Sequence, residues 1–128
     1  MDTDWAVYLL RGDASQIVEQ VRDRREAGIS VSAITVAELH VGVEQARDRA
    51  EAERALNRLL EAFPVLPFDS ALAPTFGRIQ SSLRERGIEI GDFDAAIAAT
   101  SLYYGLTLLT NNIRHFRHVE GLKVVSAT

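Results

Sequence analysis

The stretch 91–112 (GDFDAAIAATSLYYGLTLLTNN) constrains the fold more than any other part of the chain. Its two aspartates precede a helix of small residues, predicted over 93–104, and Gly105 follows where a helix commonly ends. A short apolar strand, predicted over 106–110, then leads into a polar turn over 111–116. The stretch thus allows the aspartates at its start and the polar turn at its end to meet at one rim of a sheet.

Helices and short apolar strands alternate through the rest of the chain. Residues 29–34 predict a strand, 63–68 predict an edge strand because they carry two prolines, and 122–125 predict the last strand. Helices are predicted over 5–11, from an N-cap at 13–15 to about 26, over 36–62 as an αα-hairpin, and over 71–86. Such alternation is typical of an α/β sandwich around a mainly parallel sheet, here as a single domain of residues 1–128.

The composition excludes several kinds of protein and site. Without cysteine the chain has no disulfide and no thiolate metal site, and its three histidines show no zinc-binding pattern. No apolar run approaches the roughly 18 residues of a membrane span, and no signal-peptide pattern opens the chain, so we expect a soluble cytoplasmic protein. The net charge of −4 argues against a broad basic surface for nucleic acid, but not against a nuclease with an acidic metal site. The single lysine, Lys123, disfavours an unrelated metal-dependent phosphatase.

Three acids stand where an α/β sheet presents side chains to a ligand. Parallel sheets bind ligands beyond the carboxyl ends of their strands, where loops lead into helices. Glu38 follows the strand predicted over 29–34, Asp94 opens the helix predicted over 93–104, and Asp2 lies at the start of the chain. Their positions together therefore indicate one acidic site.

Each of these acids also has an ordinary structural explanation. Glu38 completes a capping box with Thr35, which suits the start of a helix at that point. Asp92 is the natural N-cap of the next helix, and Asp94 is a first-turn acid that favours the helix dipole. Because Asp92 already has a capping role, Asp94 is the preferred metal ligand of the two.

Four stretches together resemble the VapC toxin ribonucleases, which are PIN-domain proteins of bacterial and archaeal toxin–antitoxin pairs. They are DTDWAVYLLRG (2–12), ISVSAITVAELHVGV (29–43), GIEIGDFDAAIAATSLYYGLTLLTNN (87–112) and FRHVEGLKV (116–124). The family pattern at these places is an Asp-Thr-Asn-like start, Ser/Thr-x-x-Glu-Leu, Asp-x-x-Ile-Ala-Ala and Leu-Thr-x-x-Thr-Asn. The resemblance covers almost the whole chain in the same order. It implies a PIN-like three-layer α/β/α sandwich with a mainly parallel central sheet and an αα-hairpin insertion.

The resemblance implies an endoribonuclease that uses Mg²⁺, or alternatively Mn²⁺. In such enzymes the ion activates a water and stabilises charge on the scissile phosphate. The family's catalytic, metal-binding acids match Asp2, Glu38 and Asp94 of this chain. The residues that line the family's site match Thr3, Asp4, Thr110 and Asn112.

Two positions depart from the family pattern. Many relatives carry a fourth acid shortly before Phe116, where this chain has His115, so Asp92 is a candidate substitute ligand. Relatives also carry a short apolar strand before the first aspartate, and here only Met1 precedes Asp2. The first departure leaves an alternative open, namely a catalytically weakened PIN-like module that binds RNA or protein.

The resemblance also implies partners. The expected substrate is a structured RNA such as tRNA. A cognate antitoxin is expected to lie across the hairpin over 36–62 and the helix over 93–104, and to cover the acidic crevice. An acidic pocket beside apolar helices suits an arginine-bearing amphipathic segment. Homodimers are common in the family, so we expect one here.

Overall fold

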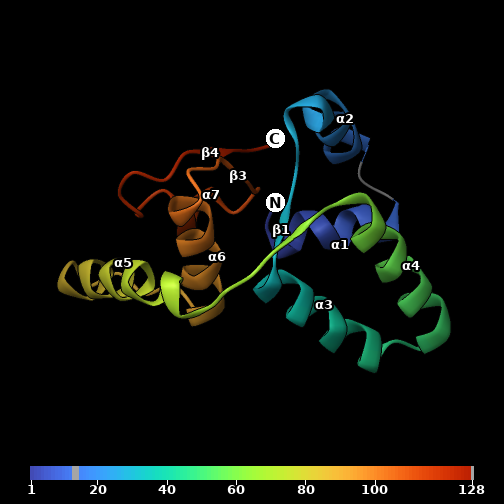
Figure 1. Cartoon of the computed structure of the whole chain (residues 1–128), viewed down its shortest axis with the longest axis horizontal. Coiled ribbons are helices and arrows are strands. Elements are labelled where there is room, and N and C mark those ends of the chain that lie inside the picture. Colours follow the sequence, from blue (N-terminus) through green and yellow to red (C-terminus); the bar gives the residue numbers. More distant parts are fainter. Residues whose placement is uncertain (13–14, 128) are drawn as a thin grey trace.

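A computed structural model describes residues 1–12 and 15–127, in which helices dominate (Figure 1). The predicted N-cap over 13–15 includes residues 13 and 14, which lie outside the described residues. The helices are α1 (Thr3–Arg11), α2 (Ser15–Arg24), α3 (Ala33–Gln45), α4 (Arg49–Ala62), α5 (Ala73–Glu85), α6 (Asp92–Tyr103) and α7 (Ile113–Phe116), with 3₁₀ turns η1 (Arg25–Ala27) and η2 (Ser70–Leu72).

Among the described residues, four short strands form two parallel pairs. β1 (Val31–Ser32) pairs with β2 (Val65–Leu66), and β3 (Leu108–Leu109) pairs with β4 (Val124–Val125). The predicted parallel arrangement is confirmed, and so is the α/β class. The strands are shorter than predicted, and they form two separate pairs rather than one sheet.

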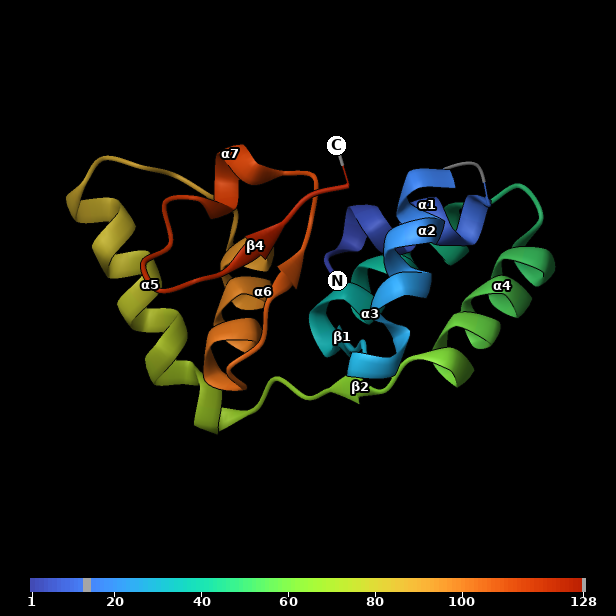
Figure 2. The same ribbon diagram turned by 90° about the horizontal axis from the view of Figure 1, so that it is seen from above.

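The two pairs belong to two groups of elements that lie side by side (Figure 2). One group contains α1 to α4, in which α3 and α4 form the predicted hairpin, and the other contains α5, α6, α7, β3 and β4. Each group has its own cluster of buried apolar side chains. β3 contributes to both, because Leu109 packs in the first cluster and Leu108 in the second. Successive strand residues point to opposite faces, so β3 joins the two cores.

The N-caps of α3 and α6 differ from the prediction. α3 begins at Ala33 because the hydroxyl of Ser32 accepts a hydrogen bond from the Thr35 backbone N–H at 3.1 Å. Ser32 is therefore the N-cap, and the predicted capping box of Thr35 with Glu38 is wrong. α6 begins at Asp92, with Gly91 as its N-cap, so the capping role predicted for Asp92 is also wrong.

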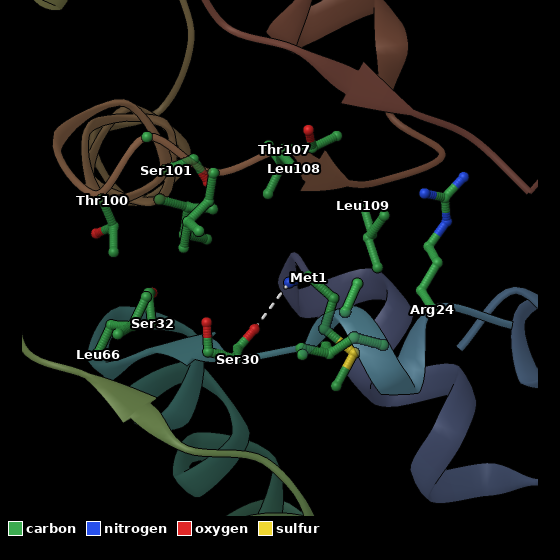
Figure 3. A pocket seen from close by; sticks show the side chains of 16 residues that line it. Met1, Arg24, Ser30, Ser32, Leu66, Thr100, Ser101, Thr107, Leu108 and Leu109 are labelled. Atoms are coloured by element: carbon green, nitrogen blue, oxygen red, sulfur yellow. Dashed lines mark hydrogen bonds between the residues drawn. The ribbon is translucent and has the colours of Figure 1, made fainter. Parts of the chain in front are cut away.

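A cavity of about 280 Å³ lies between the two strand pairs (Figure 3). Met1 and Asp2 form hydrogen bonds to its two opposite walls. The Met1 amine donates to the Ser30 carbonyl at 3.0 Å, and the Asp2 N–H donates to the Leu109 carbonyl at 3.0 Å. The chain therefore enters the fold between β1 and β3.

Both walls of this cavity carry backbone groups suited to a strand. β1 bonds to the segment of β2 through the N–H of Val31, so the backbone groups of Ser30 and Ser32 face the cavity. β3 bonds to the segment of β4 through the N–H of Leu108, so the backbone groups of Leu109 face the cavity from the other side. An extended segment joined to Met1 would run parallel to both strands and would pair with both walls.

We expect that three added residues, Val-Ile-Val before Met1, make the protein more stable than a matched Gly-Ser-Gly extension. Burial lowers the pKa of the Met1 amine to about 6. The unfolded chain then binds the proton more tightly, so the unextended chain loses stability as pH falls from 8 to 6, by at most about 3 kcal/mol. Both extensions convert this amine to an amide and remove that loss.

Urea unfolding at pH 8 and pH 6 measures both effects. Only the Val-Ile-Val extension places apolar strand-forming residues in the cavity, so it alone is expected to gain further stability at both pH values. Equal stability of the two extended chains would show that the cavity does not accept a strand.

Candidate functional site

Asp2 is buried at the start of α1 and accepts hydrogen bonds on both carboxylate oxygens. Oδ1 accepts from the Trp5 backbone N–H at 3.1 Å, which makes Asp2 the N-cap of α1, and Oδ2 accepts from the Thr110 hydroxyl. The residue is only 4% exposed. This burial raises its pKa to about 6, and the negative charge of Asp4 adds to the rise, although the two hydrogen bonds partly oppose it. Ionised Asp2 is therefore costly in the absence of a nearby cation.

A chain of polar contacts leads from Asp2 to Asp94. The Thr110 hydroxyl, which donates to Asp2, accepts from the backbone N–H of Asn112 at 2.9 Å. The Asn112 amide nitrogen lies 3.0 Å from Nδ1 of His115, and that Nδ1 lies 3.0 Å from Oδ2 of Asp94. The end of β3, the turn after it, α7 and the first turn of α6 thus place these two acids in one network.

Glu38 joins the same region through α1. Its Oε1 accepts a 2.6 Å hydrogen bond from the hydroxyl of Thr3, the residue after Asp2. The hydroxyl oxygens of Thr3 and Thr35 lie 3.2 Å apart, and Thr35 is fully buried. Because α3 begins earlier than predicted, Glu38 lies in the second turn of the helix, where it contacts Thr3 rather than its own N-cap.

Two other predicted residues lie outside this network. Asp92 accepts a 3.0 Å hydrogen bond from the amide nitrogen of Gln80 on α5. Asp4 is exposed on α1 and acts on Asp2 through its charge. Of the predicted residues, the structure therefore connects Asp2, Glu38 and Asp94 with Thr3, Thr110 and Asn112.

In the described part of the chain, the three connected acids lack a lysine or arginine partner. Among residues 1–12 and 15–127, no lysine or arginine forms an ion pair with Asp2, Glu38 or Asp94, and Asp94 meets only His115. No three His, Asp or Glu side chains in these ranges are close enough to enclose a metal ion. The oxygen donors nevertheless fit Mg²⁺ or Mn²⁺ chemically, because such ions keep several waters and do not require a complete protein cage.

Two features of the site were not predicted. His115 was expected only as the residue that replaces an acid, whereas it contacts Asp94 directly. The spacing from Asn112 to His115 was a usable signal, since residues three apart meet on a helical turn. Asn111, the first residue of the predicted polar turn, is structural: its Oδ1 accepts from the Trp5 indole N–H at 3.1 Å.

No helix in the described residues is long and apolar enough to cross a bilayer.

Comparison with known proteins places this geometry in a family. The PIN domain family model matches residues 1–122. Ribonuclease VapC2 of Haemophilus influenzae is 32% identical over 124 residues, which cover 96% of this chain and 92% of that protein. The tRNA(fMet)-specific endonuclease VapC of Shigella flexneri is 27% identical over 123 residues, with the same coverage.

A solved structure agrees with these relatives. VapBC-1 from nontypeable Haemophilus influenzae matches with a TM-score of 0.89 at 27% identity, covering 98% of this chain and 95% of that one. Together with the family match over most of the chain, this similarity shows that the chain belongs to the PIN-domain family and, within it, to the VapC ribonucleases.

Proposed function

We propose that this protein is a divalent-metal-dependent endoribonuclease and the toxin of a toxin–antitoxin pair, with tRNA as its substrate in the cytoplasm. The observation that supports the proposal is the network that links Asp2 to Asp94, with Glu38 bonded to Thr3 next to Asp2 and no lysine or arginine paired with these acids among the described residues. The printed names of the relatives from H. influenzae and S. flexneri support RNA, and tRNA in particular, as the substrate.

Asp2, Glu38 and Asp94 would hold Mg²⁺ or Mn²⁺ in this proposal. The ion would neutralise charge on the phosphodiester and lower the pKa of a water, so that hydroxide is available to attack the phosphorus. The chain's own residues fix the ligands in place. Thr110 and the Trp5 backbone N–H hold both oxygens of Asp2. Such neutral donors orient a carboxylate without cancelling its charge.

We expect Asp94→Asn to lower the rate of RNA cleavage by at least ~100-fold, because the amide cannot supply the ionised ligand. The measurement uses labelled tRNA with Mg²⁺ or Mn²⁺. Asp69→Asn is the matched control. Asp69 caps the η2 turn outside the network, and asparagine caps equally well, so its rate should not change.

Two results would contradict the proposed nuclease activity or its assignment to Asp94. Equal cleavage by wild type and Asp94→Asn would remove Asp94 from the site. No cleavage by wild type with either ion would instead favour the alternative of a PIN-like binding module.

We expect the metal-free protein to lose stability as pH rises from about 4 to 6. The folded state holds the Asp2 proton more tightly, since its pKa is raised from 3.8 to about 6. The resulting penalty above pH 6 is about 3 kcal/mol. Urea unfolding in EDTA should show the loss, and Mg²⁺ or Mn²⁺ at pH 7.5 should offset it.

Asp2→Asn tests whether Asp2 causes this behaviour. Asparagine keeps the N-cap of α1 without a charge, so in EDTA at pH 7.5 the variant should be more stable than wild type. It should also gain less from the metal. A wild-type protein that gains no more from the metal than Asp2→Asn would contradict the assignment.

The antitoxin is proposed to occupy a groove between α1, α3 and α4. This groove has a volume of about 440 Å³, and apolar side chains such as Val7, Leu10 and Val43 line it. Glu38 also lines it, so the groove is continuous with the acidic site. An amphipathic helix with an arginine at one end would match both the apolar wall and the acid.

We expect Gly42→Trp to weaken antitoxin binding at least tenfold. Gly42 is exposed in the groove, and an added Cβ there meets no atom within 4 Å, so the indole would fill the groove without disturbing α3. Gly77→Trp is the matched control, since Gly77 on α5 is equally open and lies outside the groove. Binding is measured by calorimetry with the antitoxin from the same operon. Equal weakening by both variants would contradict this location.

The expected homodimer stays a prediction. Tyr103, Tyr104 and Leu106 are exposed together at the end of α6, and this apolar surface is the candidate interface.

A further inference from the structure

One ring nitrogen of His115, Nδ1, contacts two polar groups that a single hydrogen or a single lone pair cannot both bond, with the Asn112 amide oriented as it is here. Its Nδ1 lies 3.0 Å from the Asn112 amide nitrogen and 3.0 Å from Oδ2 of Asp94. An imidazole nitrogen has one position in the ring plane, which carries either a hydrogen or a lone pair. If Nδ1 carries a hydrogen, it donates to Asp94, but this hydrogen then points at the amide N–H of Asn112. If Nδ1 carries a lone pair, it accepts from Asn112, but this lone pair then faces the carboxylate oxygen of Asp94.

A cation beside Nδ1 and Asp94 removes this conflict. It attracts the lone pair and the carboxylate at the same time, whereas with the Asn112 amide nitrogen toward Nδ1, neither a hydrogen nor a lone pair there satisfies both neighbours. The separation is also suitable. Two adjacent ligands of an octahedral ion with bonds of about 2.1 Å lie about 3.0 Å apart, which is the distance from Nδ1 to Oδ2 of Asp94.

We propose that His115 binds the divalent ion directly, beside Asp94, and makes the site select Mn²⁺ over Mg²⁺. The inference rests on the metal-dependent function proposed above. Carboxylates suit both ions, but an imidazole nitrogen is a ligand for first-row transition ions and a poor one for Mg²⁺. Of these two ions, Mn²⁺ is the one that accepts the carboxylates and the imidazole together.

The position of His115 supports this role. The side chain is 47% exposed, so it borders solvent at the mouth of the site, while Asp94 is 31% exposed. An incoming ion therefore reaches both groups without a change in the core. The other histidines lie apart from this network: His40 is exposed on α3 and His118 contacts Arg117.

The test uses the purified full-length protein and Mn²⁺ without RNA. Pulsed electron paramagnetic resonance of bound Mn²⁺ should detect the ¹⁴N coupling of a directly bound imidazole in wild type. His115→Asp should abolish this coupling, and His40→Asp, a matched change at another exposed histidine, should retain it.

Calorimetric titration with each ion gives the selectivity. Wild type should bind Mn²⁺ at least tenfold more tightly than Mg²⁺. His115→Asp should reduce this ratio at least fivefold, because it leaves only oxygen ligands. His40→Asp should keep the wild-type ratio.

The outcomes separate this inference from the proposed function. Mn²⁺ binding that depends on Asp94 but shows no ¹⁴N coupling would overturn the role of His115 and leave the metal site standing. An unchanged Mn²⁺/Mg²⁺ ratio in His115→Asp would do the same. Binding that is equally tight in wild type and Asp94→Asn, or absent from wild type, would overturn both.

Discussion

The buried carboxylate of Asp2 is the interaction on which both the fold and the site depend. One oxygen begins α1 and the other accepts from Thr110 at the end of β3, while the Asp2 backbone N–H bonds to Leu109. These contacts tie the group of helices α1 to α4 to the group around β3. Because the same burial raises the pKa of Asp2, the contact that joins the two halves also creates a need for positive charge.

The alternation of elements and the main acids could be predicted because both are local signals. Short apolar runs bounded by glycine or proline indicated strands, and the hairpin of α3 and α4 followed from helical periodicity interrupted by charged residues. Asp2, Glu38 and Asp94 were found because each stands where a loop enters a helix. Their connection through Thr3 and Thr110 was not derivable from spacing, since it depends on contacts between distant segments.

Helix starts were less predictable, because neighbouring residues compete for the same capping position. Thr35 and Ser32 are both good N-caps, and the hydroxyl of Ser32 takes the position because Val31 is already paired with β2. Likewise Gly91 precedes α6, which leaves Asp92 to bond with Gln80. The separation of the strands into two pairs could not be read from apolar runs, which do not specify strand partners.

The distribution of arginine explains why the site stays negative in a chain with thirteen arginines. Arg49 and Arg54 pair with glutamates on the outer surface of the α3–α4 hairpin, where both partners are exposed. Such pairs contribute little to stability. An arginine beside Asp2 or Asp94 would form a stronger pair in a less solvated place, but it would also neutralise the carboxylates that are proposed to hold a metal ion. Neutral hydroxyls and one imidazole hold these acids instead, so their positions are fixed while their charge remains available to a cation.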